Sequence, residues 1–133
     1  MALRIYAEQN VHDEVVRGLA SIYTDRGFQT CKNENQQKNM DFNGLYPDVI
    51  VRLKGENKYW LFEVETESSI TSKEAEQWKQ YGQTFPFFLM VPSSMVAQAQ
   101  VLISENNIQN VNLRQYEHNS RGGQTFYGLP GIE

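Results

Sequence analysis

Cysteine is almost absent from this chain, which has one, Cys31, among 133 residues. A single thiol cannot close an internal disulfide or build a cysteine-based zinc site. It has no activating pattern around it, so we expect it to pack as a small hydrophobic residue. Scarcity of cysteine is typical of a reducing compartment, and the predicted location is cytoplasmic. Histidine is scarce too, and His12 and His118 have no metal-ligand or catalytic neighbour in sequence, which predicts ordinary surface or partly buried residues.

Long apolar runs are lacking as well. No stretch approaches the ~20 apolar residues that a membrane helix needs. Residues 1–4 show no apolar core of a secretory signal. Contact with a membrane is therefore not expected. The length suits one domain with one core, covering 1–133. A loose tail is expected over 118–133, although Phe126, Tyr127 and Leu129 could dock back.

Positive charge is in deficit, with 12 lysines and arginines against 16 acidic residues and a formal net charge of −4. This balance disfavours a protein that binds nucleic acid through bulk positive charge. An enzyme with a local basic rim around an acidic metal site stays compatible with this charge balance. Glycine-rich phosphate loops, nucleophile elbows and zinc-ligand spacings are also missing. A nucleic-acid function must thus rest on one particular site.

The spacing of apolar residues predicts a mixed α/β fold. Expected helices cover 11–26, 71–82 and 92–105, the first capped by Asn10 and the second by Thr71. Expected strands cover 28–32, 48–54, 59–65, 85–91 and 108–116, and a polar loop covers 33–44. A hairpin followed by helical crossovers implies a mixed sheet flanked by helices on both faces. The order is an αβββαβ core followed by an extra helix and strand.

Acidic residues gather at the ends of the two hairpin strands. Pro47 and Asp48 open the first strand, and Glu63 and Glu65 close the second. Packing explains such a cluster poorly, because like charges that face one another destabilise a sheet. A divalent metal would make it favourable, since hard oxygen ligands suit Mg²⁺ or Mn²⁺. The alternative interpretation is a solvated sheet edge that is merely acidic.

The proposed cluster depends on the register of the hairpin. Glu63 and Glu65 lie two residues apart and therefore share a face of their strand. A two-residue loop at 56–57 would place Asp48 opposite Glu65 and diagonal to Glu63, with all three carboxylates on one face. A three-residue loop would move Asp48 to the other face.

The second expected helix carries a polar stripe. Lys73, Gln77 and Tyr81 follow one another at intervals of four residues and so lie on one side of the helix. A lysine, an amide and a phenol in a row can position a phosphate and a water beside a metal. The stripe equally fits a solvated helix face with Tyr81 half-buried. The first helix adds Glu14 as a supporting candidate, although an exposed surface acid is the commoner situation.

These residues resemble the PD-(D/E)xK nuclease superfamily, which has the restriction-endonuclease-like fold. The family core runs αβββαβ, the order expected here over 10–92. Its signature is a Pro-Asp that opens one strand and an acid-x-Lys on the next, to which 47–48 and 63–65 are similar. The following helix looks like the Q-x-x-x-Y motif of the RecB-like branch, with Gln77 and Tyr81 at its two ends.

One departure from the family pattern is that Glu65 stands where the family has lysine. Some members use an acid at this place, and others take the lysine from the neighbouring helix. If the lysine comes from the neighbouring helix, Lys73 is the best substitute for the family lysine in this chain, and Lys79 is the second. If neither lysine reaches the site, the resemblance implies binding of metal or nucleic acid without cutting.

The resemblance implies a metal-dependent nuclease that hydrolyses phosphodiester bonds in DNA. Asp48 and Glu63 would hold Mg²⁺ (or Mn²⁺), and Glu65 would be a further ligand or the general base. Lys73 would steady the attacking water or the scissile phosphate. The residues expected to contact the substrate are Gln77, Lys79 and Tyr81.

Two alternatives stay open. A catalytically inactive member of the fold would act as a DNA-binding or assembly subunit, with salt-dependent binding and no metal-stimulated product. A protein-interaction domain would instead present Trp60, Phe62 and Trp78 as a surface patch. The expected partner is DNA, with RNA as the alternative, and the small size suggests a homodimer or a larger complex. No element suited to reading base sequence in the major groove is evident.

Overall fold

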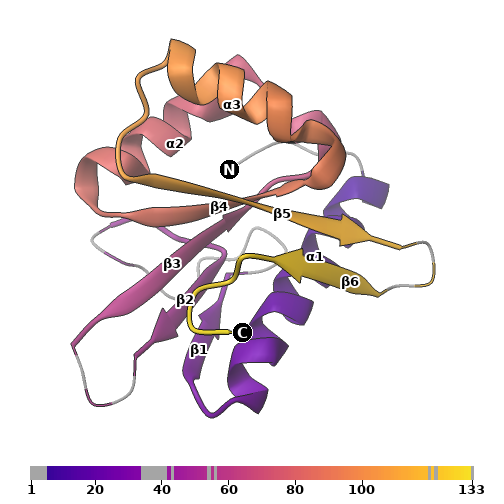
Figure 1. Ribbon diagram of the computed structural model, residues 1–133, viewed down its shortest axis with the longest axis vertical. Helices are drawn as coiled ribbons and strands as arrows, with labels where there is room; N and C mark the ends of the chain where they lie inside the picture. The colour runs from indigo at the N-terminus through magenta and orange to yellow at the C-terminus, as the bar shows by residue number, and fades with distance from the viewer. Residues whose placement is uncertain are drawn as a thin grey trace.

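The computed structural model of the chain describes residues 6–33, 42, 44–53, 55, 57–119, 121 and 123–132. Within these ranges a mixed six-stranded sheet and three α-helices form one α/β domain (Figure 1). The helices are α1 (Tyr6–Asp25), α2 (Ser72–Thr84) and α3 (Val96–Glu105), with 3-10 turns η1 (Glu67–Ser69) and η2 (Ser93–Met95). The strands are β1 (Gln29–Lys32), β2 (Val49–Arg52), β3 (Tyr59–Val64), β4 (Phe87–Pro92), β5 (Val111–His118) and β6 (Gln124–Tyr127).

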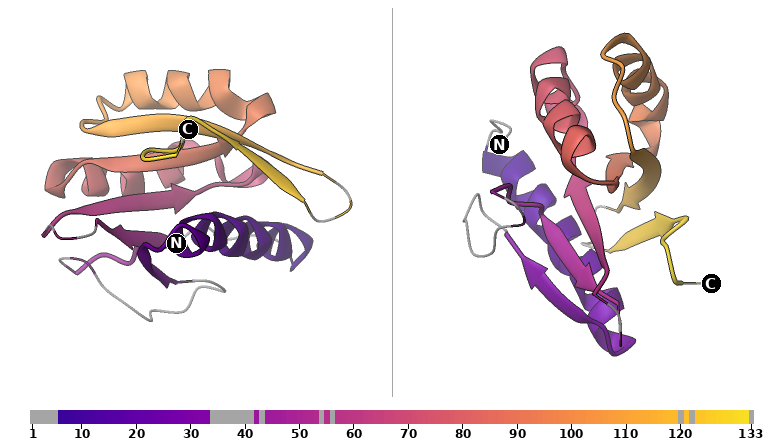
Figure 2. Two further views of the ribbon diagram at one scale, coloured as in Figure 1. Left: turned by 60° about the horizontal axis from the view of Figure 1, so that its bottom comes forward. Right: turned by 90° about the vertical axis from the view of Figure 1, so that its left-hand side faces the viewer.

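The strands follow one another across the sheet in sequence order, from β1 to β6. β3, β4 and β5 run parallel, whereas β1, β2 and β6 pair antiparallel with their neighbours. Two helical crossovers, through α2 and α3, join the parallel strands. Right-handed crossovers between consecutive strands place both helices on the same face of a sheet, and α1 covers the other face (Figure 2).

Alternation along the central strands separates two apolar cores. Leu61 and Leu89 pack beneath α2 and α3, and Phe62 and Met90 pack against α1. Successive side chains of a strand point to opposite faces, so a strand covered on both sides is apolar throughout. The prediction of helices on both faces and of a buried central strand near 85–91 is confirmed.

Several predicted boundaries differ from the structure. α1 begins at Tyr6, so Asn10 lies inside the helix and does not cap it. The hydroxyl oxygen of Thr71 does accept the N–H of Glu74, which confirms the predicted cap of α2. β5 begins at Val111, because residues up to 110 complete the turn after α3. The predicted loop over 33–44 lies largely outside the described residues.

The hairpin register differs from the predicted one by two residues. Val49 pairs with Phe62, so Asp48 falls opposite Glu63 and not opposite Glu65. The N–H of Leu53 bonds the carbonyl of Lys58 at 2.9 Å, in the same register as the pairs of β2 and β3. A shift of two residues preserves the face on which each strand side chain lies. Asp48 precedes β2, however, and its carboxylate lies against His12 of α1, whereas Glu63 bonds Tyr81 of α2, so the predicted sharing of one face does not hold for Asp48.

The C-terminal segment is not the loose tail that the sequence predicts. Residues 124–127 form β6, which pairs antiparallel with β5. Beyond β6, Leu129 is buried against the α1 side of the core, and the hydroxyl of Tyr23 donates to the carbonyl oxygen of Pro130 at 2.6 Å. In the described part of the chain, no helix is long and apolar enough to cross a membrane.

Candidate functional site

Three carboxylates meet beside the carboxyl end of β3. Asp48, Glu63 and Glu65 are 4%, 5% and 1% exposed, respectively. Acidic side chains are almost never this buried unless they are paired. The way each carboxylate is satisfied therefore indicates what the cluster can do.

Asp48 is held by the backbone of β3 and by α1. Its Oδ2 accepts the N–H of Val64 at 2.8 Å and lies 3.2 Å from Nε2 of His12. Nδ1 of His12 lies 3.1 Å from Oδ1 of Asp13. Both ring nitrogens thus lie beside carboxylate oxygens, and Nδ1 also lies 3.5 Å from the amide nitrogen of Gln9.

The prediction that His12 is an ordinary surface or partly buried residue is therefore wrong. It is 3% exposed and links α1 to the start of β2. Only Asp13 is adjacent to it in sequence, and nothing in the sequence indicates that residues 12 and 48 meet. His118 is partly buried, as predicted, and its Nε2 lies 3.5 Å from the carboxylate of Glu14.

Glu65 is engaged by both of its carboxylate oxygens. Oε2 accepts the indole N–H of Trp78 at 2.8 Å, and Oε1 accepts the hydroxyl of Ser69 at 2.6 Å. Its backbone carbonyl also accepts the hydroxyl of Tyr116 at 2.6 Å. These bonds tie α2 and β5 to the end of β3. Each oxygen of the Glu65 carboxylate therefore already accepts one hydrogen bond, which leaves its second lone pair for a metal ion or a proton.

Glu63 is the member of the cluster that stays unsatisfied. Its Oε1 is buried and has no hydrogen-bond partner among the described residues. Burial raises the pKa of Glu63 well above its ordinary value, and the nearby carboxylates of Asp48, Glu65 and Glu74 raise it further. A hydrogen bond from Tyr81 acts in the opposite direction. This carboxyl group must therefore hold a proton or face a cation.

The polar stripe of α2 lines a pocket of about 420 Å³. Lys73, Gln77 and Tyr81 all border it, as the helical spacing predicts, together with Tyr46 at the start of the hairpin. Tyr81 is 1% exposed and not half-buried, because its ring packs among the aromatic residues under α2. Burial is the largest cause of the strongly raised pKa of Tyr81, and the charge of Glu63 raises that pKa further. The hydroxyl therefore stays protonated and able to donate.

The other candidates lie elsewhere. Lys79 is exposed and is not among the residues that line the pocket. Cys31 is half-buried and packs against the core beneath α2, as predicted for a small hydrophobic residue. The predicted interaction patch of three aromatic residues is not formed, since Phe62 and Trp78 are fully buried and Trp60 packs beside the α1 core.

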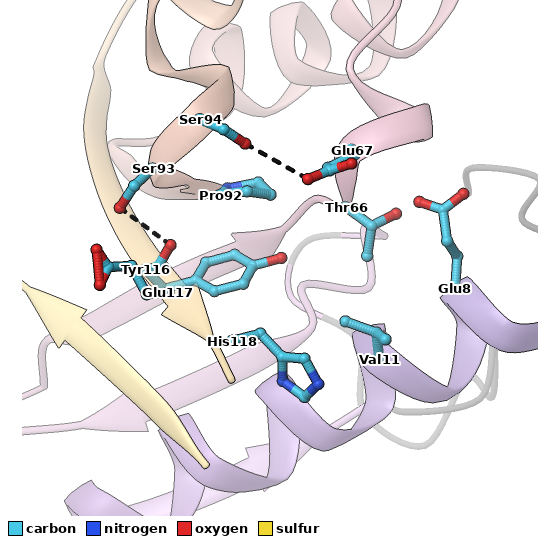
Figure 3. A pocket seen from close by; sticks show the side chains of 10 residues that line it. All are labelled: Glu8, Val11, Thr66, Glu67, Pro92, Ser93, Ser94, Tyr116, Glu117 and His118. Atoms are coloured by element: carbon cyan, nitrogen blue, oxygen red, sulfur yellow. Dashed lines mark hydrogen bonds between the residues drawn. The ribbon is translucent and has the colours of Figure 1, made fainter. Parts of the chain in front are cut away.

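A second pocket, of about 490 Å³, lies where the carboxyl ends of β4 and β5 approach η1 and the first turns of α1 (Figure 3). No sequence pattern predicted it. Among the described residues, three carboxylates border it, from Glu8, Glu67 and Glu117, and no lysine or arginine does. The hydroxyl of Ser68 donates to the carboxylate of Glu8, and the hydroxyl of Ser94 donates to the carboxylate of Glu67. Such a lining repels phosphate.

The cluster around Glu63 differs from a closed metal cage. Within the described residues, no three His, Cys, Asp or Glu side chains are arranged to hold one ion. Mg²⁺ does not require such a cage, because proteins usually bind it through one or two carboxylates, with water and substrate phosphate completing the shell. Asp48 and Glu63, with its unpartnered Oε1, fit that smaller donor set.

Comparison with known proteins adds no further evidence about function. No protein-family model matches the chain, and no curated protein matches it. The candidate function is therefore derived from the arrangement of its own residues.

Proposed function

We propose that this chain is a metal-dependent nuclease of the PD-(D/E)xK type, which hydrolyses phosphodiester bonds in DNA. The observation that carries the proposal is the buried, unpartnered Oε1 of Glu63 beside the carboxylates of Asp48 and Glu65. A protein that needed only stability would gain by replacing such a group, because an unsatisfied buried polar atom costs about 1–3 kcal/mol. The αβββαβ order of elements is consistent with that family.

Asp48 and Glu63 would hold Mg²⁺ or Mn²⁺. A bound divalent ion lowers the pKa of a coordinated water and stabilises negative charge that develops on a phosphate. His12 would keep the Asp48 carboxylate oriented through Nε2, and the N–H of Val64 fixes the same oxygen from β3. Glu65 would hold α2 against the strand end through Trp78.

The substrate would enter from the pocket lined by α2. Lys73, which lines this pocket, would neutralise a phosphate and would take the place of the lysine that the family carries at position 65. Gln77 would orient the phosphate backbone. Tyr81 borders this pocket and also bonds Glu63, so its hydroxyl would couple the substrate to the acidic cluster.

The test is cleavage of labelled DNA in Mn²⁺ or Mg²⁺ by the wild type, Asp48→Ala and Glu63→Gln, with circular dichroism as the check on folding. Glu105→Gln is the matched control, because Glu105 is an exposed acid on α3 and is not among the residues that line this pocket. We expect both site variants to lose cleavage and the control to keep it. Cleavage that survives in folded Asp48→Ala would contradict the assignment of the site.

A second candidate is a catalytically inactive protein of the same fold that acts as a DNA-binding or assembly subunit. The favouring observation is that Glu65, at the place of the family lysine, accepts hydrogen bonds from Trp78 and Ser69 and so has a structural role. This candidate predicts salt-dependent binding of DNA, or of RNA, with no metal-stimulated product. Either candidate is compatible with a homodimer or a larger complex.

A further inference from the structure

One helix at the surface carries almost no charge. Residues 80–104 contain no aspartate, glutamate, lysine or arginine, although these residue types make up 21% of the chain. Burial explains this composition for β4 but not for α3, which is exposed at Ala97, Gln100 and Val101 and has its single charge at its last residue, Glu105. The outer face of a surface helix normally carries charged and polar residues, whereas the core of a protein–protein contact is depleted of charge. The composition of α3 therefore indicates an interaction surface.

A groove of about 370 Å³ continues this face of α3 onto the sheet. Val96 and Gln100 of α3 line it, together with Leu113 of β5 and Tyr127 of β6. Val101 and Tyr127 are 54% and 42% exposed, which makes them two of the three large hydrophobic side chains exposed among the described residues. Exposed apolar side chains that gather in one place mark interaction sites, whereas single ones need no explanation.

Two charged residues of β5 border the groove, and each has a partner within the chain. Nε of Arg114 donates to the carbonyl oxygen of Gly128 at 2.7 Å, and its guanidinium lies 5.4 Å from the centre of the Phe88 ring. The carboxylate of Glu117 accepts the hydroxyl of Tyr127 at 3.2 Å. Neither residue is therefore an isolated charge that would attract a phosphate or a basic ligand.

Strand β6 extends the same surface to the edge of the sheet. It is the last strand in the order of the sheet, and its residues, Gln124–Tyr127, carry no charge. β1, at the opposite edge, carries Lys32. Proteins commonly protect edge strands with charged side chains, lysine above all, because an unprotected edge can pair with another chain. The sequence of β6 lacks this protection.

We propose that the uncharged face, which consists of the exposed side of α3, the groove and β6, is the contact between two copies of this chain. In a two-fold contact a patch meets the same patch of the other copy, so a charge near the axis faces its own like. Like charges across a contact cost affinity, and the net charge of −4 makes the remaining surface repel a second copy. An uncharged patch is the part of such a surface that is complementary to itself.

Other partners fit this face less well. A nucleic acid needs lysines and arginines to neutralise its phosphates, and a basic protein would be attracted to the carboxylates of the pocket in Figure 3. The inference does not depend on the proposed nuclease function, because none of the residues that carry it belongs to the acidic cluster.

The test is sedimentation equilibrium of the full chain over a series of micromolar concentrations, at low and at high salt. We expect a reversible dimer whose affinity does not fall as salt is added, because salt screens the repulsion between two chains of charge −4 and an uncharged contact has no attraction to lose. A monomer at every concentration, or a dimer that dissociates when salt is added, would overturn the inference.

Two substitutions place a charge on the uncharged face. Val101→Glu and Gln100→Glu should each raise the dissociation constant of the dimer at least about tenfold. Both positions are exposed, so the fold of the monomer should persist, with circular dichroism as the check. Gln83→Glu is the matched control, because it adds the same charge at an exposed position of α2 that does not line the groove. Unchanged dimerisation of Gln100→Glu, or an equal loss in Gln83→Glu, would overturn the inference.

Discussion

Removing the charge of Glu63 should stabilise the metal-free protein. The side chain is 5% exposed, its Oε1 has no partner in the described part of the chain, and carboxylates of Asp48, Glu65 and Glu74 surround it. Glu63→Gln keeps the shape of the side chain and cannot ionise. We therefore expect this variant to unfold at higher urea concentration than the wild type in buffer with a chelator at neutral pH.

The size of the effect follows from its dependence on pH. Because burial and the neighbouring carboxylates raise the pKa of Glu63, the folded state holds its proton more tightly than the unfolded chain. The stability linked to this proton is fully present below the ordinary value of 4.5 and is lost as pH rises toward the folded-state pKa. The loss is at most about 1.4 kcal/mol per pH unit.

The measurement is urea unfolding of wild type, Glu63→Gln and Glu76→Gln at several pH values. As pH rises from about 5 to about 7, the free energy of unfolding of Glu63→Gln should increase by about 1–3 kcal/mol relative to that of the wild type. That gain corresponds to about 3–5 °C in Tm per kcal/mol for a domain of this size. Glu76→Gln, on the exposed side of α2, should show no such trend. A difference between Glu63→Gln and wild type that stays flat across this range would refute the reasoning.

Three further substitutions test how the site is supported, each by urea unfolding. Trp78→Phe removes the indole N–H that donates to Glu65 at 2.8 Å, and it should cost about 1–3 kcal/mol because a buried carboxylate oxygen loses its partner; an unchanged midpoint would argue against that bond. Thr71→Ala removes the side-chain cap of α2 and should cost about 1 kcal/mol of stability. The contrary result would be a loss of helical circular dichroism smaller than a cost of that size requires. Gly82→Ala places a methyl group against the carbonyl oxygen of Gln109 and should cost about 1–3 kcal/mol, as overpacking does, unless the backbone moves freely there.

Local patterns in the sequence determined the elements and their type. Apolar spacing predicted the three helices, the hairpin and the central strand, because a helix and a strand each repeat with their own period and bury one stripe or face. Thr71 was identifiable as a cap because the capping bond closes within four residues. The stripe of Lys73, Gln77 and Tyr81 was identifiable for the same reason, since intervals of four residues place side chains on one side of a helix. All three side chains line one pocket.

The boundaries and the last strand were decided by more distant parts of the chain. α1 extends to Tyr6, four residues before the residue that was expected to cap it. The segment 124–127 becomes a strand because β5 offers it an edge to pair with, and no local pattern carries that information. The register of the hairpin likewise follows from the whole connection between Leu53 and Lys58.

Only the tertiary structure decided the state of each carboxylate. Asp48, Glu63 and Glu65 were recognisable from sequence as a cluster, but their partners lie far along the chain: His12 for Asp48 and Trp78 for Glu65. These contacts form between α1, the hairpin and α2, and their strength depends on burial, which a sequence does not display. Burial and mutual repulsion leave Glu63 as the carboxylate that needs a proton or a cation, because the cost of a charge is set by the surroundings that folding creates.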